Sequence, residues 1–230
     1  MVRPGGPDRP LLWALGALTL VSGVVDAVSY LGLGRVFTAN MTGNVVLLGF
    51  AAAGAPGFSV AASLASLGAF LVGAVGAGRL VRRLPRRRLL LLTALAIEGG
   101  LVAIASVVAY AATTVTTGWA RFVVIVLLAL GMGVRNSVIR RLAVPDVTTT
   151  VLTMTLTGLA ADSSLAGGDN SRVGRRAGAV GAMLLGAFGG AWLYLRLGAG
   201  LPLTVAATTV LGTAAVFGRA RTSRRLDEPT

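Results

Sequence analysis

The sequence contains no cysteine, no histidine and no lysine, and only 13% of its 230 residues are charged. Without cysteine or histidine, the chain cannot form a disulfide, a thiol nucleophile, a haem ligand, a histidine-based triad or a zinc site of the usual kind. An ordinary soluble domain carries roughly 25% charged residues, so the composition disfavours a soluble enzyme. No serine or paired-aspartate nucleophile motif is recognisable either, and we expect no enzymatic activity, no cofactor and no bound metal.

The residues that are abundant point to a membrane. Apolar residues make up 55% of the chain, which also holds 32 glycines and carries a net charge of +13. All the basic residues are arginines, and they cluster between apolar runs, which is typical of cytoplasmic loops and disfavours a nucleic-acid partner. We therefore expect the lipid bilayer, with its anionic headgroups, to be the main partner of these clusters, at residues 82–88, 140–141, 172–176 and 219–225.

Eight apolar segments follow one another along the chain. A membrane-spanning helix needs roughly 20 apolar residues, and six of the segments meet that need. The segments at 38–54 and 147–166 are marginal, because each begins with a polar, threonine-rich stretch. The first segment follows two arginines without a fitting cleavage site, so we interpret it as a retained span and not a signal peptide. The other six segments lie at 11–33, 58–80, 89–112, 119–140, 177–197 and 201–219.

The arginine clusters decide between two topologies. If all eight segments crossed, the cluster at 172–176 and the C-terminal cluster would fall outside. If segments 38–54 and 147–166 are re-entrant, every cluster and both termini fall inside, including a basic tail at 220–230. The sequence thus predicts a single-domain (1–230), all-α, polytopic membrane helical bundle of about six full spans plus two Thr-rich re-entrant or broken segments.

The two halves of the chain look related. With an offset of 110 residues, Gly23 matches Gly133, and Asp26 falls on Asn136. Stripes of small residues, which let helix backbones approach closely, recur at four-residue spacing in both halves. Because each repeat, 11–112 and 119–219, holds three crossings, the second copy must be inverted. Inverted repeats with broken segments near the midplane are typical of transporters and channels. The stripes are Ala65, Ala69, Gly73 and Ala77, and then Gly178, Ala182, Gly186 and Gly190.

Three motifs carry a resemblance to a known family. The runs at 26–31, 34–44 and 140–157 read DAVSYL, GRVFTANMTGN and RRLAVPDVTTTVLTMTLT. They resemble the YoaK-like family of bacterial inner-membrane proteins, and the resemblance covers nearly the whole chain. The family is known chiefly as a domain of unknown function. The resemblance therefore implies a location in the bacterial cytoplasmic (inner) membrane but supplies no substrate.

Ionisable residues within the apolar segments are the main chemical signal. Asp26, Glu98 and Asp162 lie in or at the end of spans, where a charge costs several kcal/mol unless it faces the protein interior. Each is part of a proton or cation relay, a contact to the substrate, or a structural hydrogen-bonding group; in the last case Asp26, for instance, would cap the segment that starts at Thr38. Arg135 is either a buried partner of one carboxylate or, as we expect, an anchor at the inner membrane face one turn before Arg140.

The two Thr-rich segments also admit two interpretations. On a helix, Thr149, Thr153 and Thr157 form one hydroxyl stripe, and Thr and Asn residues at 38–44 form its counterpart. Facing stripes would line a path for a small polar solute or ion, whereas isolated hydroxyls would only hydrogen-bond neighbouring helices. We favour the lined path. The candidate binding residues are Asp26, Thr38, Asn40, Thr42, Asn44, Glu98, Asn136, Thr149, Thr153 and Thr157.

Three functions remain open at this point. The first is a small secondary transporter, with Asp26 or Glu98 carrying a coupled proton. The second is a passive channel of hourglass type, which the symmetric Thr and Asn lining fits equally well. The third is a membrane partner protein without transport activity. Formation of a homo-oligomer is compatible with each of them.

Overall fold

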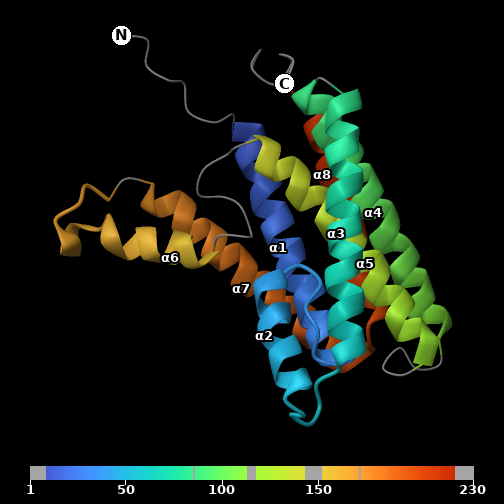
Figure 1. The fold of residues 1–230 in the computed structure, drawn as a ribbon. Helices are drawn as coiled ribbons and strands as arrows, with labels where there is room; N and C mark the ends of the chain where they lie inside the picture. Colours follow the sequence, from blue (N-terminus) through green and yellow to red (C-terminus); the bar gives the residue numbers. More distant parts are fainter. Residues whose placement is uncertain (1–8, 85, 113–117, 143–151, 171, 221–230) are drawn as a thin grey trace.

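The computed structural model describes residues 9–84, 86–112, 118–142, 152–170 and 172–220. Within these ranges the chain forms eight α-helices and one short 3-10 helix (Figure 1). The α-helices are α1 (Arg9–Gly32), α2 (Met41–Ala52), α3 (Val60–Arg83), α4 (Arg87–Ala111), α5 (Gly118–Leu142), α6 (Leu152–Ala161), α7 (Val173–Leu197) and α8 (Gly200–Arg219), and the 3-10 helix is η2 (Ser164–Ala166).

Six of these helices are long and apolar enough to cross a membrane, and α2 and α6 are short. The shortest of the six, α8, has 20 residues, and a helix of that length spans about 30 Å, the thickness of a bilayer core. The predicted fold class is therefore confirmed. The largest difference in bounds concerns the predicted segment 147–166: α6 has only 10 residues, and residues 147–151 lie outside the described part of the chain.

The directions of the helices show where the short ones belong. Helices α1, α4 and α7 run down the bundle as drawn, and α3, α5 and α8 run up it (Figure 1). Gly186 lies against Leu20 and Gly190 against Val24, which agrees with α1 and α7 running the same way. The chain therefore enters and leaves α2 at one end of the bundle, as a re-entrant segment does, whereas α6 and the first part of α7 project sideways from the bundle (Figure 1).

Most arginines gather at the end of the bundle where α6 is attached. Arg9 of α1 and Arg175 of α7 line one groove there, and Arg88 of α4 donates a hydrogen bond of 2.6 Å to the carbonyl of Gly218 in α8. This packing places the starts of α1, α4 and α7 beside the end of α8. The ends of α1, α3, α4, α7 and α8 that lie here (Figure 1) carry in their sequences Arg9, Arg82, Arg83, Arg87, Arg88, Arg175 and Arg219.

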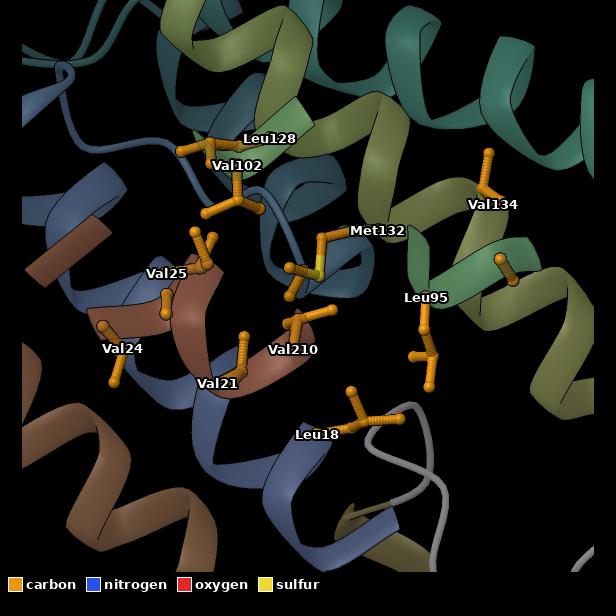
Figure 2. Packing of buried hydrophobic residues seen from close by; sticks show 14 of the residues in the cluster. Leu18, Val21, Val24, Val25, Leu95, Val102, Leu128, Met132, Val134 and Val210 are labelled. Carbon is orange, nitrogen blue, oxygen red and sulfur yellow. The ribbon is translucent and has the colours of Figure 1, made fainter. Parts of the chain in front are cut away.

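A core of aliphatic side chains joins α1, α4, α5 and α8. Figure 2 shows Leu18 and Val21 of α1 in this cluster together with Leu95 of α4, Met132 of α5 and Val210 of α8, all of them buried. Because these side chains are apolar, a polar group in the interior can form hydrogen bonds only with the few other polar groups there. Any buried charge in this bundle must therefore be compensated locally.

Two helix crossings are built on glycine in the same way. A Cβ atom on Gly73 of α3 would collide with the carbonyl of Leu130 in α5, and one on Gly186 of α7 would collide with the carbonyl of Leu20 in α1. Most of the predicted small-residue stripes lie at these helix contacts, since Ala69 and Gly190 are buried beside these glycines, whereas Gly178 is exposed with nothing within 4 Å of a Cβ atom. Close backbone approach of this kind is how helices associate in lipid.

Candidate functional site

Asp26 joins α1 to the loop that precedes α2. Its side chain is 5% exposed, and its Oδ1 accepts hydrogen bonds from the backbone N–H groups of Thr38 (3.0 Å) and Ala39 (2.8 Å). The structural alternative, in which Asp26 caps the segment starting at Thr38, is thus present. The second oxygen, Oδ2, is also buried but accepts no hydrogen bond within the described residues. Oδ1 is therefore an acceptor within the fold, whereas Oδ2 has no donor among the described residues.

Asn44 fixes the same loop to α3. Its amide accepts from the N–H of Phe37 (2.8 Å) and donates to the Phe37 carbonyl (2.6 Å), while Ser66 of α3 donates to that carbonyl at 2.7 Å. Asn40 caps the N-terminus of α2, where its side chain accepts from the N–H of Gly43. Both asparagines hold the backbone of the loop in place. The predicted helical stripe from residue 38 is wrong, because α2 starts only at Met41.

A cavity of about 380 Å³ lies beside Asp26. Its walls come from α1, from the start of α2, from the start of α6 and from α7. Polar groups and apolar groups share the lining, which is typical of a site for a small ligand. The residues are Ser22, Asp26, Ala39, Asn40, Thr42, Gly43, Val46, Leu152, Thr153 and Met183.

The other predicted site residues have different positions. Thr38 is buried but meets Asp26 through its backbone, and Asn136 is buried in α5 without lining the cavity. Thr157 is exposed, and its hydroxyl donates to the Thr153 carbonyl, so the pair forms no hydroxyl stripe facing the bundle. Thr149 lies outside the described residues. Of the threonines predicted in the two segments, the cavity thus brings together Thr42 and Thr153.

Arg135 forms a buried ion pair with Glu98, and our interpretation of it as a surface anchor is wrong. Its Nη1 lies 2.8 Å from Glu98 Oε1, and both side chains are 0% exposed. Five residues along a helix rotate by about 140°, so Arg135 faces the core while Arg140 faces outward. Nη1 also donates to the carbonyl of Leu18 at 3.1 Å, which ties α4 and α5 to α1.

Ser22 connects this ion pair to the cavity. It lies one turn before Asp26 on α1, lines the cavity and accepts a hydrogen bond from Nη2 of Arg135. The sequence analysis missed Ser22, although its spacing of four residues from Asp26 places both on one face of a helix. Glu98 itself does not line the cavity, and its hydrogen-bonded connection to the site runs through Arg135 and Ser22.

The third intramembrane acid has a different task. Asp162, just after α6, pairs with Arg176 of α7 at 2.7 Å, and Arg176 also donates to the carbonyl of Gly158. These bonds tie α6 to α7 at the arginine-rich end of the bundle. Within the described residues, no group of three or more His, Cys, Asp or Glu side chains could hold a metal ion. The chemistry available at the cavity is thus that of one carboxylate with hydroxyl and amide groups.

Comparison with known proteins places this architecture in a family. Residues 14–216 match the family described as "Protein of unknown function (DUF1275)". The chain belongs to this family. It is also 34% identical over 152 residues to the UPF0700 transmembrane protein YoaK of Bacillus subtilis (strain 168), a match that covers 65% of this chain and 66% of that protein. No solved structure matches the chain.

Membership of the DUF1275 family confirms the resemblance that the three motifs carry, and it agrees with a membrane protein. The matched range begins within α1 and ends within α8, so it contains Asp26, the cavity and the Glu98–Arg135 pair. The chain spans just under two thirds of the length of its YoaK relative. The description of the family gives no activity, and the function must be argued from the site.

Proposed function

We propose that the protein is a small secondary transporter for a small polar solute or ion, and that the cavity beside Asp26 is its binding site. The observation that carries the proposal is the buried Oδ2 of Asp26, which accepts no hydrogen bond from the described residues. A buried carboxylate oxygen without a donor is costly, because its hydration is lost without replacement. A ligand or a proton in the adjacent cavity would replace it.

The arrangement of the helices supports an inverted-repeat transporter. Helix α5 runs opposite to α1, α7 opposite to α3, and α8 opposite to α4 (Figure 1). The glycine crossings between the two halves correspond as well: Gly23 of α1 packs against the Met183 carbonyl of α7, and its repeat mate Gly133 of α5 packs against the Phe70 carbonyl of α3. In inverted-repeat transporters the substrate binds where the broken segments of the two repeats meet, and the repeats then rock about the site.

The two short helices are held differently, which supports a division into a fixed and a moving part. The loop before α2 is bonded to α1 through Asp26 and to α3 through Asn44. Helix α6 is bonded to α7 through Arg176. We propose that α6 moves together with the start of α7, while the part of α7 from Met183 to Gly190 stays packed against α1, and that this movement opens the cavity to one side of the membrane at a time.

The arginine distribution supports a location in the cytoplasmic membrane with both chain ends inside. The arginines at the starts of α1, α4 and α7 would lie against the anionic cytoplasmic leaflet. The opposite end of the bundle holds fewer arginines, among them Arg35, Arg121 and Arg196. In this orientation, α2 enters from outside and α6 enters from inside.

A passive channel of hourglass type is the alternative, and one observation favours it. Thr42 near the start of α2 and Thr153 near the start of α6 line the same cavity, as the facing half-segments of such a channel would. A channel only equilibrates its solute, whereas a coupled transporter accumulates it. Accumulation above the outside concentration under an imposed pH gradient therefore separates the two.

Asp26→Asn tests the proposal most simply. Asparagine keeps an Oδ1 acceptor for the N–H groups of Thr38 and Ala39 but carries no charge. We expect the variant to fold and insert, and to lose at least tenfold of the pH-driven uptake into proteoliposomes. Asn136→Asp should be tolerated less well, because it buries a second carboxylate. Full pH-driven uptake by Asp26→Asn would refute the role of Asp26 in transport.

Ser106→Ala is the matched control for this experiment. The Ser106 hydroxyl is buried in α4 and bonded to the Gly200 carbonyl at 3.0 Å, and Ser106 does not line the Asp26 cavity. Its removal also deletes a buried polar group but should leave uptake within about twofold of the parent protein. If Ser106→Ala melts at a lower temperature but keeps its uptake, then a loss of stability alone does not abolish uptake, and the loss in Asp26→Asn arises at the site.

A further inference from the structure

The charges buried in the bundle do not balance. Asp26, Glu98 and Arg135 are the ionisable side chains buried between α1, α4 and α5, so two carboxylates face one guanidinium. The fourth buried ionisable residue among those described, Arg176, is paired with Asp162 at the end of α6. The interior near the cavity thus carries a net charge of −1 when all three groups are ionised.

Asp26 is the carboxylate of the two that has no ion-pair partner, although Oε2 of Glu98 is also buried without a hydrogen bond within the described residues. Arg135 is bonded to Glu98 Oε1 and acts on Asp26 only through space. The loop before α2 offers backbone N–H groups, α6 and α7 line the cavity with Thr153 and Met183, and α8 has no charged residue before Arg219. Asp26 is thus the group at which a positive ligand would neutralise the interior, and burial of an uncompensated charge is strongly unfavourable.

The lining of the cavity indicates which cation fits. The Asp26 carboxylate and the side-chain oxygens of Thr42 and Thr153 are hydrogen-bond acceptors for an N–H donor. The walls also present the apolar side chains of Val46 and Met183. A volume of about 380 Å³ exceeds what a bare ion fills and lies within the range of sites for small organic molecules, about 300–1,000 Å³. An ammonium group with a short apolar tail uses both kinds of lining.

We propose that the cavity binds one small organic ammonium ion in exchange for one proton on Asp26. This inference rests on the proposed transport function and names its substrate class. In the exchange, the protonated Asp26 carboxyl group releases its proton to the solvent, and the carboxylate pairs with the ammonium ion that enters. The interior stays neutral in both states, so the exchange moves no net charge across the membrane.

The first test is binding of the n-alkylammonium chlorides, from methyl to butyl, to the purified full chain in detergent, by titration calorimetry. Affinity should rise about fourfold for each added methylene that reaches the apolar wall, which is the usual gain for its burial. In weakly buffered acidic solution, each bound butylammonium should release one proton. Equal affinity along the series, binding without proton release, or binding of Na⁺ or K⁺ in place of the amines would overturn the proposal.

The second test changes the buried charge at Glu98 and Arg135, which do not themselves line the cavity. Glu98→Gln brings the interior charge to zero, and we expect at least tenfold weaker binding of butylammonium. Adding Arg135→Gln to Glu98→Gln restores a charge of −1, and affinity should return to within about threefold of the parent. Replacing both partners of a buried ion pair is tolerated far better than replacing one, so the double variant also controls for folding. A double variant that folds but binds no better than Glu98→Gln would overturn the proposal.

Transport and binding are separable in these experiments. Amine binding with proton release but no vesicle flux would uphold this inference and refute the transporter. Flux of a neutral solute or an anion, without amine binding, would uphold the transporter and overturn the inference. For amine flux driven by a pH gradient, the rate should not change when the membrane potential is clamped with potassium and valinomycin. A rate that follows the potential would contradict the one-for-one exchange.

Discussion

The first half of the chain, α1–α4, and the second half, α5–α8, share their packing but differ in their polar residues. Gly73 and Gly186 make equivalent helix contacts in the two halves. Asp26 in the first half, however, stands where the second half has Asn136, and Asn44 stands where the second half has Met154. Asn44 is 0% exposed and bonded to the loop before α2, whereas Met154 is 66% exposed.

This difference separates what holds the bundle together from what acts in it. Close glycine contacts depend only on shape, so both halves can use them equally. A carboxylate is different, because two at equivalent buried positions would repel each other and double the cost of burial. The chain accordingly has an acid at only one of the two equivalent positions, Asp26 and Asn136, with one anchored loop and one fully buried ion pair, and we expect these single features to carry the function.

The largest effect should come from breaking the ion pair between Glu98 of α4 and Arg135 of α5, because Arg135 has no charged counterpart in the first half. Arg135→Met leaves Glu98 as an uncompensated buried charge and should cost about 3–5 kcal/mol of stability, measured by unfolding in mild detergent. Val25 stands at the equivalent position of α1 and is buried without a charge. Unchanged stability in Arg135→Met would mean that Arg135 lies at the surface.

A smaller effect should be equal in the two halves. Gly73→Ala and Gly186→Ala each place a methyl group against a backbone carbonyl and should each cost about 1–3 kcal/mol, since the helices must move apart. Gly76→Ala and Gly189→Ala are the controls, because nothing lies within 4 Å of a Cβ atom at either position. A cost at only one glycine of the first pair would break the equivalence of the two crossings.

The smallest effects should distinguish the two anchors of the short helices. Asn44→Ala leaves the N–H of Phe37 without its acceptor and should cost about 1–3 kcal/mol. Asp162→Asn removes an ion pair whose carboxylate side is 46% exposed and should cost less than about 1 kcal/mol. Thermal unfolding of the two variants side by side measures the difference. Equal losses would contradict a firmly anchored α2 and a loosely held α6.

Much of the fold could be predicted from the sequence, because apolar runs of sufficient length and the side preference of arginine are both strong local signals. The six long helices and the return of α2 to its own end of the bundle followed from these two patterns. The hydrogen bond from Asp26 to the segment at Thr38 was also among the alternatives. These features depend on the order of residues along the chain more than on the direction in which a side chain points from its helix.

The features that could not be predicted depend on helix rotation and on where a helix starts. Arg135 was assigned to the surface through its distance from Arg140 along the chain, but the helical twist turns it to Glu98. Asn40 caps α2, so the residues before it leave the helix and their predicted stripe does not form. Thr157 bonds to the carbonyl four residues earlier, a local bond that competes with any role facing a cavity. Only the packed structure supplies these orientations.

The central claim, that the cavity beside Asp26 lies on a transport path, is tested most directly by cysteine accessibility. The chain has no native cysteine, so single cysteines at Thr42 and Thr153 can be labelled with an impermeant thiol reagent in right-side-out and inverted vesicles. Cysteines at Gly57 and at Leu84 or Gly174 define the outer and inner sides. We predict that each cavity cysteine reacts from both sides, and that butylammonium protects it unless Asp26→Asn is also present. Reaction from one side only, or protection that does not depend on Asp26, would contradict the account.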